Sequence, residues 1–158
     1  MNLYPPTVVL RHRKENLKKC SLRGLESRED FDFYTYPKEV LPKLNNYIVL
    51  SFDGPLLTTK DARKGLFILD ATWKYAGKMY ENSPEIHTLE RRSLPQLFRT
   101  AYPRIQNDCP DPSRGLASIE AIFVAYHLMG RSTEGLLDLY HWKNEFLEIN
   151  REIFLPDF

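Results

Sequence analysis

Residues 66–73 read Leu66-Phe67-Ile68-Leu69-Asp70-Ala71-Thr72-Trp73. Four large apolar residues in a row predict a short strand that is buried on both faces. Asp70 then stands at the carboxyl end of the strand, and in open α/β sheets that edge is where ligands bind. Trp73 follows three residues later, close enough to share a pocket with Asp70. Each residue also has a simpler interpretation, because an Asp after a strand often caps the next helix and a Trp there often packs in the core.

The chain has the size and composition of a globular protein. Its 158 residues are enough for one compact core or for two small lobes that share one. With 42% hydrophobic and 27% charged residues, the composition argues against wholesale disorder. The net charge of +1 does not by itself indicate a nucleic-acid binder, so such a role requires a local patch.

Cysteine spacing and hydropathy argue against several other classes of protein. Cys20 and Cys109 are far apart and belong to no CxxC or histidine-spaced pattern, so we predict neither a disulfide framework nor a metal site. No apolar stretch approaches the length of a membrane span, and the N-terminus lacks the pattern of a signal peptide. We therefore expect a cytoplasmic protein that binds neither metal nor membrane.

Two further apolar runs predict strands. Residues 7–10 form a β-branched run after two prolines, and residues 47–52 lead into an Asp-Gly-Pro turn. Between the second run and residue 66, residues 58–62 have the capping-box spacing of a short helix. A strand, a crossover helix and a second strand form a βαβ unit, which predicts a parallel sheet.

The densest positive charge in the chain follows the first predicted strand. One interpretation is contact with phosphate groups at a strand end, and the other is a solvated loop and helix start, in which Ser21 is a candidate cap. Further on, Tyr34 and Tyr36 alternate with polar residues and indicate a short edge strand. The basic residues concerned are Arg11, Arg13, Lys14, Lys18, Lys19 and Arg23.

Helical periodicity dominates the second part of the chain. Apolar residues recur at helical spacing in residues 93–102, 118–129 and 132–150. Residues 103–114 contain three prolines and two aspartates and predict a loop, while residues 74–87 predict a looser connection. No strand is expected after this connection.

The two parts of the chain therefore differ in class. We predict an α/β lobe with a parallel sheet over residues 1–90 and an all-helical lobe over residues 91–158. Neither contains a complete P-loop, GxGxxG, GxSxG or HExxH motif, and the four histidines are isolated. Glu120, at the start of the most regular helix, is most simply an acid favoured by the helix dipole.

Six segments spread along the chain, in a fixed order, resemble those of one family. The sequence is similar to the ribosomal RNA aminocarboxypropyltransferases, which are similar in fold to the knotted SPOUT-type RNA methyltransferases. One loop departs from the family pattern, because Ala101–Asn107 is followed by an insertion that runs to Arg114. The matching segments are Lys18-Lys19-Cys20-Ser21, Val49-Leu50 with Thr59-Lys60-Asp61, Leu69-Asp70-Ala71-Thr72-Trp73, Arg92-Ser93-Leu94-Pro95-Gln96-Leu97, Leu116-Ala117-Ser118-Ile119-Glu120-Ala121, and Trp142 to Asn150.

The resemblance implies a SPOUT-like fold with a trefoil knot, in which the helical lobe completes a pocket for S-adenosylmethionine. Such an enzyme presents the aminocarboxypropyl arm of the sulfonium, and not its methyl group, by orientation. Asp70 would accept a proton from a pyrimidine ring nitrogen or orient the base, and Trp73 would bury the methyl group. The implied cofactor-binding residues are Ser21, Leu50, Trp73, Leu94, Leu116 and Ser118.

The implied substrate is a modified or unmodified uridine or pseudouridine in ribosomal RNA, bound as RNA or as a pre-ribosomal particle by a monomer. The basic residues after the first strand would hold its phosphates. Two alternatives remain open at this point. One keeps the fold and the cofactor but transfers the methyl group, and the other is a non-catalytic RNA-binding module whose altered 102–114 loop has closed the pocket.

Overall fold

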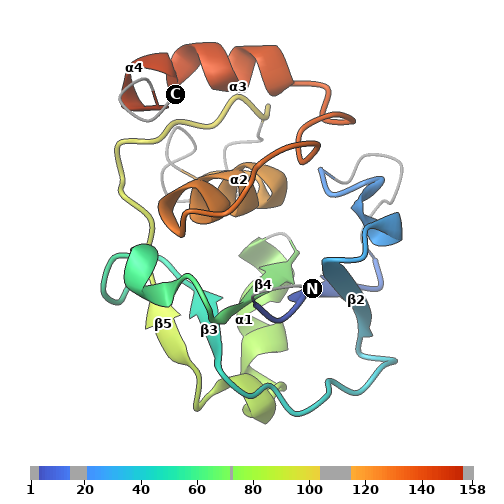
Figure 1. Ribbon diagram of the computed structural model, residues 1–158. Helices are drawn as coiled ribbons and strands as arrows, with labels where there is room; N and C mark the ends of the chain where they lie inside the picture. The colour runs from blue at the N-terminus through green and yellow to red at the C-terminus, as the bar shows by residue number, and fades with distance from the viewer. Residues whose placement is uncertain (1–3, 15–20, 72, 104–114, 155–158) are drawn as a thin grey trace.

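A computed structural model describes residues 4–14, 21–71, 73–103 and 115–154. Five strands form one fully parallel sheet in the order β2-β1-β4-β3-β5 (Figure 1). The strands are β1 (Thr7–His12), β2 (Phe31–Tyr36), β3 (Tyr47–Leu50), β4 (Gly65–Asp70) and β5 (Glu90–Arg92). The helices are α1 (Trp73–Glu81), α2 (Ser118–Leu128), α3 (Lys143–Ile149) and α4 (Arg151–Phe154), with 3₁₀ turns at Leu25–Ser27, Thr59–Asp61 and Pro84–Ile86.

Burial explains the strand order. β1 is buried along its whole length and β4 at five of its six positions, and these two strands lie inside the sheet. β2 and β5 are more exposed and are the two outermost strands. The three strands predicted from apolar runs are confirmed, as are the parallel pairing of β3 with β4 and the edge strand that carries Tyr34 and Tyr36. The pairing of β1 with β4 was not predicted.

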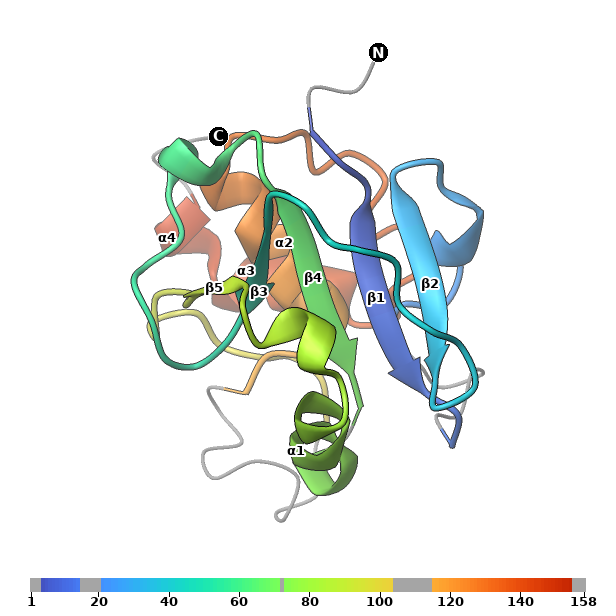
Figure 2. The same ribbon diagram turned by 90° about the horizontal axis from the view of Figure 1, so that it is seen from below.

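Helices cover both faces of the sheet (Figure 2). On the α1 face, Met79 and Ile86 pack with apolar side chains of β1, β3 and β4, among them Phe67. On the opposite face, α2 lies against the sheet and α3 and α4 lie beyond it (Figure 1). The core on this face runs from Val9 to Phe154, so residues from both predicted lobes pack together in it. Among the helices that the structure describes, none is both long and apolar enough to cross a membrane.

Several predicted elements were wrong. The looser connection after residue 73 is the helix α1, whose Met79 is fully buried under the sheet. The crossover before β4 is a single 3₁₀ turn at Thr59–Asp61, although its capping box at Thr58 is present. The charged segment Glu90–Arg92 is a strand, because an edge strand with exposed side chains needs no apolar run.

Two predicted helices are also absent or shortened. Residues 93–102 form no helix, since Ser93 continues the pairing with the loop after β3 and side chains of the helical layer hold the later residues. Within 132–150, α-helix is confined to Lys143–Ile149, while residues 132–142 form turns. Gly135 has a φ of 80°, which a right-handed helix does not accommodate.

Candidate active site at the carboxyl edge of the sheet

All five strands end at one edge of the sheet, which we call the carboxyl edge, because the sheet is fully parallel. Asp70 ends β4 there and is only 4% exposed. In the strand register Arg11 of β1 lies beside Asp70, and its Nε donates to Asp70 Oδ2 at 3.3 Å. The hydroxyl of Ser118, the first residue of α2, donates to Asp70 Oδ1 at 2.9 Å. The carboxylate is therefore oriented from both sides.

Arg11 connects Asp70 to a second acid. Its Nη1 lies 3.1 Å from Glu26 Oε2, and its guanidinium carbon is 4.6 Å from the centre of the Phe33 ring. Burial alone would raise the pKa of Glu26, but hydrogen bonds from the backbone of residues 26 and 24 and from Arg11 lower it below its usual value. Glu26 is therefore an anion at neutral pH, and Arg11 links it to Asp70.

The N-terminus of α2 lies at the site, on the face of the sheet to which Arg11 and Asp70 point. Ser21 Oγ accepts the backbone N–H of Ile119 at 3.3 Å, so Ser21 caps a helix 98 residues away and not a helix of its own. Because a helix N-terminus carries a partial positive charge, Asp70 lies where an acid is stabilised. The cap and the Ser118 bond fix the start of α2 relative to β4.

Glu120 does more than interact favourably with the dipole of α2. Its buried carboxylate accepts four hydrogen bonds: from Thr100 Oγ1 at 2.6 Å, Ala101 N at 2.9 Å, Ala117 N at 2.8 Å and Tyr140 Oη at 2.9 Å. Hydrogen bonds to a carboxylate are stronger than neutral ones, and they are strengthened further in a core that excludes water. Glu120 ties the segment after β5 to the start of α2.

Asn150 holds the same segment from the other direction. Its Oδ1 accepts the N–H of Arg99 at 2.8 Å, and its Nδ2 donates to the carbonyl of Arg99 at 2.9 Å. This side chain is fully buried. Together Glu120 and Asn150 hold the backbone of residues 99–101 against the helical layer.

Three of the predicted cofactor-binding residues, Leu50, Leu94 and Leu116, lie around this edge. All three are half-buried and pack against the core on the α2 face. Leu50 ends β3 and stands opposite Arg92 of β5, two residues before Leu94. Ser93 also binds the loop after β3, through its Oγ to the carbonyl of Gly54 at 2.8 Å. The structure thus brings Leu50 and Leu94 to the same part of the edge.

The predicted RNA-binding group divides into a buried residue and exposed ones. Arg11 is 7% exposed and pairs with two acids, so the expectation that it lies on a phosphate-binding surface is corrected by its burial. Arg13, Lys14 and Arg23 are exposed. Lys18 and Lys19, the Trp73 side chain and residues 104–114 lie outside what the structure describes.

Sequence reasoning missed the partners of Asp70. A signal for Arg11 was available, because strand side chains alternate and Arg11 therefore shares a face with the core residue Val9. Nothing in the sequence pointed to the Ser118 hydrogen bond or to the four donors around Glu120. Among the described residues, no group of three His, Cys, Asp or Glu side chains is placed to hold a metal ion.

Comparison with known proteins agrees with this architecture. The family described as the DTW domain matches residues 4–148. Two proteins named 16S rRNA aminocarboxypropyltransferase, from Methanosarcina mazei and Methanosarcina acetivorans, are each 29% identical over 137 residues, which cover 85% of this chain and 75% of the relative. The solved structure of the SAM-dependent rRNA:acp-transferase Tsr3 from Vulcanisaeta distributa superposes with a TM-score of 0.71 at 24% identity, over 94% of this chain and 80% of that one. This likeness shows a shared fold.

Proposed function

The chain belongs to the DTW-domain family, and we propose that it transfers the 3-amino-3-carboxypropyl group of S-adenosylmethionine to a uridine or pseudouridine of ribosomal RNA, releasing methylthioadenosine. The names of the two Methanosarcina relatives support the reaction and the class of substrate. The observation that carries the proposal is the buried Asp70 carboxylate at the carboxyl edge, which Arg11 and Ser118 hold in one orientation.

The residues at the edge fit the proposed cofactor. S-Adenosylmethionine needs an apolar surface for its adenine and polar groups for its amino-acid end. Leu50, Leu94 and Leu116 supply half-buried apolar side chains, and Ser21 and Ser118 supply hydroxyls at the start of α2. Once bound, the sulfonium activates its attached carbons towards a nucleophile.

Asp70 acts on the acceptor base. A carboxylate is a weak base for the N–H of a pyrimidine ring, so we assign Asp70 mainly to orienting that N–H towards the activated carbon, with proton acceptance as the bond forms. Arg11 and Ser118 are positioning residues, because each fixes one oxygen of the carboxylate. Trp73, which begins α1 three residues after Asp70, would cover the methyl group and leave the aminocarboxypropyl arm exposed to attack.

The wider context is part of the same proposal. We propose that the fold is SPOUT-like and contains a trefoil knot, that residues 91–158 complete the pocket built on residues 1–90, and that the protein acts as a cytoplasmic monomer in ribosome biogenesis. Exposed Arg13, Lys14 and Arg23, with Lys18 and Lys19, would contact RNA phosphates.

Product analysis tests the reaction. The protein is incubated with small-subunit ribosomal RNA and S-adenosylmethionine labelled in the carboxypropyl arm or in the methyl group. Transfer of the arm label with release of methylthioadenosine is the expected result. Methyl label in RNA with release of adenosylhomocysteine would replace this proposal by the methyltransferase, and no turnover despite RNA binding would favour the non-catalytic module.

Two variants make the assignment of Asp70 specific. Asp70→Asn should lose turnover by at least about 100-fold, since proton acceptance and the Arg11 pair are both lost. Asp53→Asn is the matched control, because Asp53 is also an acid beyond a strand end of the same edge but is exposed. Equal activity of the two variants would remove Asp70 from the mechanism.

A further inference from the structure

Three aromatic rings form a row across the carboxyl edge, on the side away from Asp70. Tyr36 ends β2, His12 ends β1, and Tyr75 lies in the first turn of α1 after β4. The His12 and Tyr75 rings are stacked, with centres 4.1 Å apart and an angle of 16° between their planes. The His12 and Tyr36 rings are 5.7 Å apart. We call these three side chains the aromatic row.

Strand alternation places this row and the candidate active site on opposite faces of one edge. Arg11 and His12 are neighbours in β1, so their side chains point to opposite faces of the sheet. Arg11 points to the α2 face, where it meets Asp70. His12 points to the α1 face, where it meets Tyr75. A single strand of nucleic acid that crosses the edge could therefore reach both.

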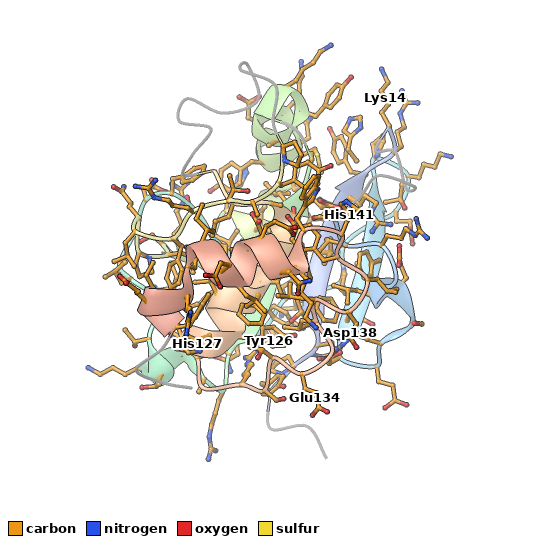
Figure 3. All side chains as sticks on the ribbon, turned by 90° about the horizontal axis from the view of Figure 1, so that it is seen from above. Lys14, Tyr126, His127, Glu134, Asp138 and His141 are labelled. Atoms are coloured by element: carbon orange, nitrogen blue, oxygen red, sulfur yellow. The ribbon has the colours of Figure 1, made fainter. Side chains whose placement is uncertain are left out.

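Basic residues surround the aromatic row. Residues 12–14 and 71–80 contain four lysine and arginine residues and no acidic residue. Two of the four, Lys14 and Lys74, place their ammonium groups 5.7 Å and 5.5 Å from the centre of the Tyr75 ring. Both lysines are exposed, and Lys14 points away from the body of the molecule (Figure 3). The combination of stacked rings and flanking cations is typical of surfaces that bind single-stranded nucleic acid.

His12 behaves as part of an aromatic surface and not as a cation. Burial, together with the charges of Arg13 and Lys14, lowers its pKa below the usual value. Its Nδ1 accepts the backbone N–H of Lys14 at 3.0 Å, which requires that nitrogen to be unprotonated. The ring is thus held neutral and in place between the two tyrosines.

We propose that the aromatic row, flanked by Arg13, Lys14 and Lys74, is the surface on which bases next to the target nucleotide stack, while the target itself turns over the carboxyl edge to Asp70. This inference rests on the proposed function and adds to it a docking site for single-stranded RNA. The partly exposed Tyr36 and Tyr75 offer the stacking surfaces, and the lysines contact phosphates on either side of the stacked bases. The RNA segment that binds here must be unpaired, because the faces of bases inside a double helix are already stacked on neighbouring bases and cannot stack on tyrosine rings.

Binding of a fluorescein-labelled single strand of ten uridylates, measured by anisotropy, tests the docking surface without any turnover. Tyr75→Ala should weaken binding about 5- to 150-fold, as expected for the loss of one stacked base, whereas Tyr75→Phe should bind within about twofold of the wild type. Lys14→Glu and Lys74→Glu change exposed side chains and keep the test valid if Tyr75→Ala fails to fold. Each should weaken binding and flatten its salt dependence.

Lys60→Glu is the matched control. Lys60 is exposed in the 3₁₀ turn that precedes β4, so it lies at the end of the sheet where the strands begin, away from the carboxyl edge. Loss of binding in this control equal to that in Lys14→Glu would overturn the proposal. So would no binding by the wild type at low salt, or unchanged binding by Tyr75→Ala. Equal competition by decaglutamate would also overturn it, in favour of an acidic protein partner.

The outcomes separate this inference from the proposed function. If the RNA strand binds through Tyr75 but no aminocarboxypropyl group is transferred to ribosomal RNA, the docking surface stands and the reaction fails. If transfer occurs and the Tyr75 and lysine variants bind normally, the reaction stands and the docking surface fails.

Discussion

Glu120→Gln tests how much the four hydrogen bonds to the buried Glu120 carboxylate contribute to the stability of the fold. Each carboxylate oxygen accepts one backbone N–H and one hydroxyl: Ala117 and Thr100 on Oε1, Ala101 and Tyr140 on Oε2. A hydroxyl can rotate and accept from the new amide group, but an N–H cannot. In either orientation of the amide, one buried N–H therefore loses its acceptor.

The expected loss of stability follows from the one N–H that is left without an acceptor. An orphaned buried N–H costs about 1–3 kcal/mol, and the remaining hydrogen bonds lose their charge-assisted strength, which is roughly twofold. The smaller desolvation cost of a neutral amide offsets part of this loss. We expect the free energy of unfolding to fall by about 2 kcal/mol, a substantial part of the 5–15 kcal/mol typical of a domain.

Urea unfolding followed by tryptophan fluorescence measures the effect. With a slope of about 2 kcal/mol per molar urea, the midpoint should fall by about 1 M. Glu145→Gln on the exposed side of α3 makes the same chemical change and should cost less than about 0.5 kcal/mol. If the Glu120 and Glu145 variants shift the midpoint equally, the four hydrogen bonds to Glu120 do not add to the free energy of unfolding.

Three further predictions concern other parts of the molecule. Arg11→Lys keeps the charge but loses the forked contact with two acids, so turnover should fall about tenfold with an unchanged dissociation constant for S-adenosylmethionine; equal turnover would refute the positioning role. Burial raises the pKa of Tyr126 from 10.0 to about 12, so its contribution to stability is complete below pH 10 and is lost as the pH rises through 12. Between these values the free energy of unfolding should fall by about 2–3 kcal/mol more in the wild type than in Tyr126→Phe, as measured by urea titration at each pH. A Cβ on Gly65 would clash with the Tyr47 ring, so Gly65→Ala should lower the free energy of unfolding in urea by about 1–3 kcal/mol, and by much less in a Tyr47→Ala background.

The sheet was predictable from the sequence where burial was two-sided. The runs at residues 7–10, 47–52 and 66–69 are apolar because neighbours cover both faces of these strands. The parallel pairing of the last two runs followed from the crossover predicted between them. β5 carries no such run, because an edge strand with exposed side chains leaves no hydrophobic signal. The placement of Asp70 at the carboxyl edge followed from the strand alone, with no knowledge of its partners.

The helical layer was less predictable because its conformation depends on distant partners. Residues 93–102 have helical periodicity, yet they form no helix, and Glu120 and Asn150 bind the backbone of Arg99 and Ala101. Residues 132–142 repeat leucines at helical spacing, but Leu136 and Leu137 fill the core from turns. Periodicity records which side chains are buried, and a turn pinned by long-range hydrogen bonds can bury the same residues as a helix.

The two adjacent residues Arg11 and His12 explain how one edge could serve chemistry and RNA binding together. Their alternation sends a cation to the dry α2 face, where it orients Asp70, and an uncharged ring to the α1 face, where it stacks on Tyr75. A shift of β1 by one residue would exchange these positions and disrupt both sites, so the register Arg11–Asp70 matters more than either side chain alone. That register is set by the core residues of β1, which means that packing in the middle of the sheet determines the geometry at its edge.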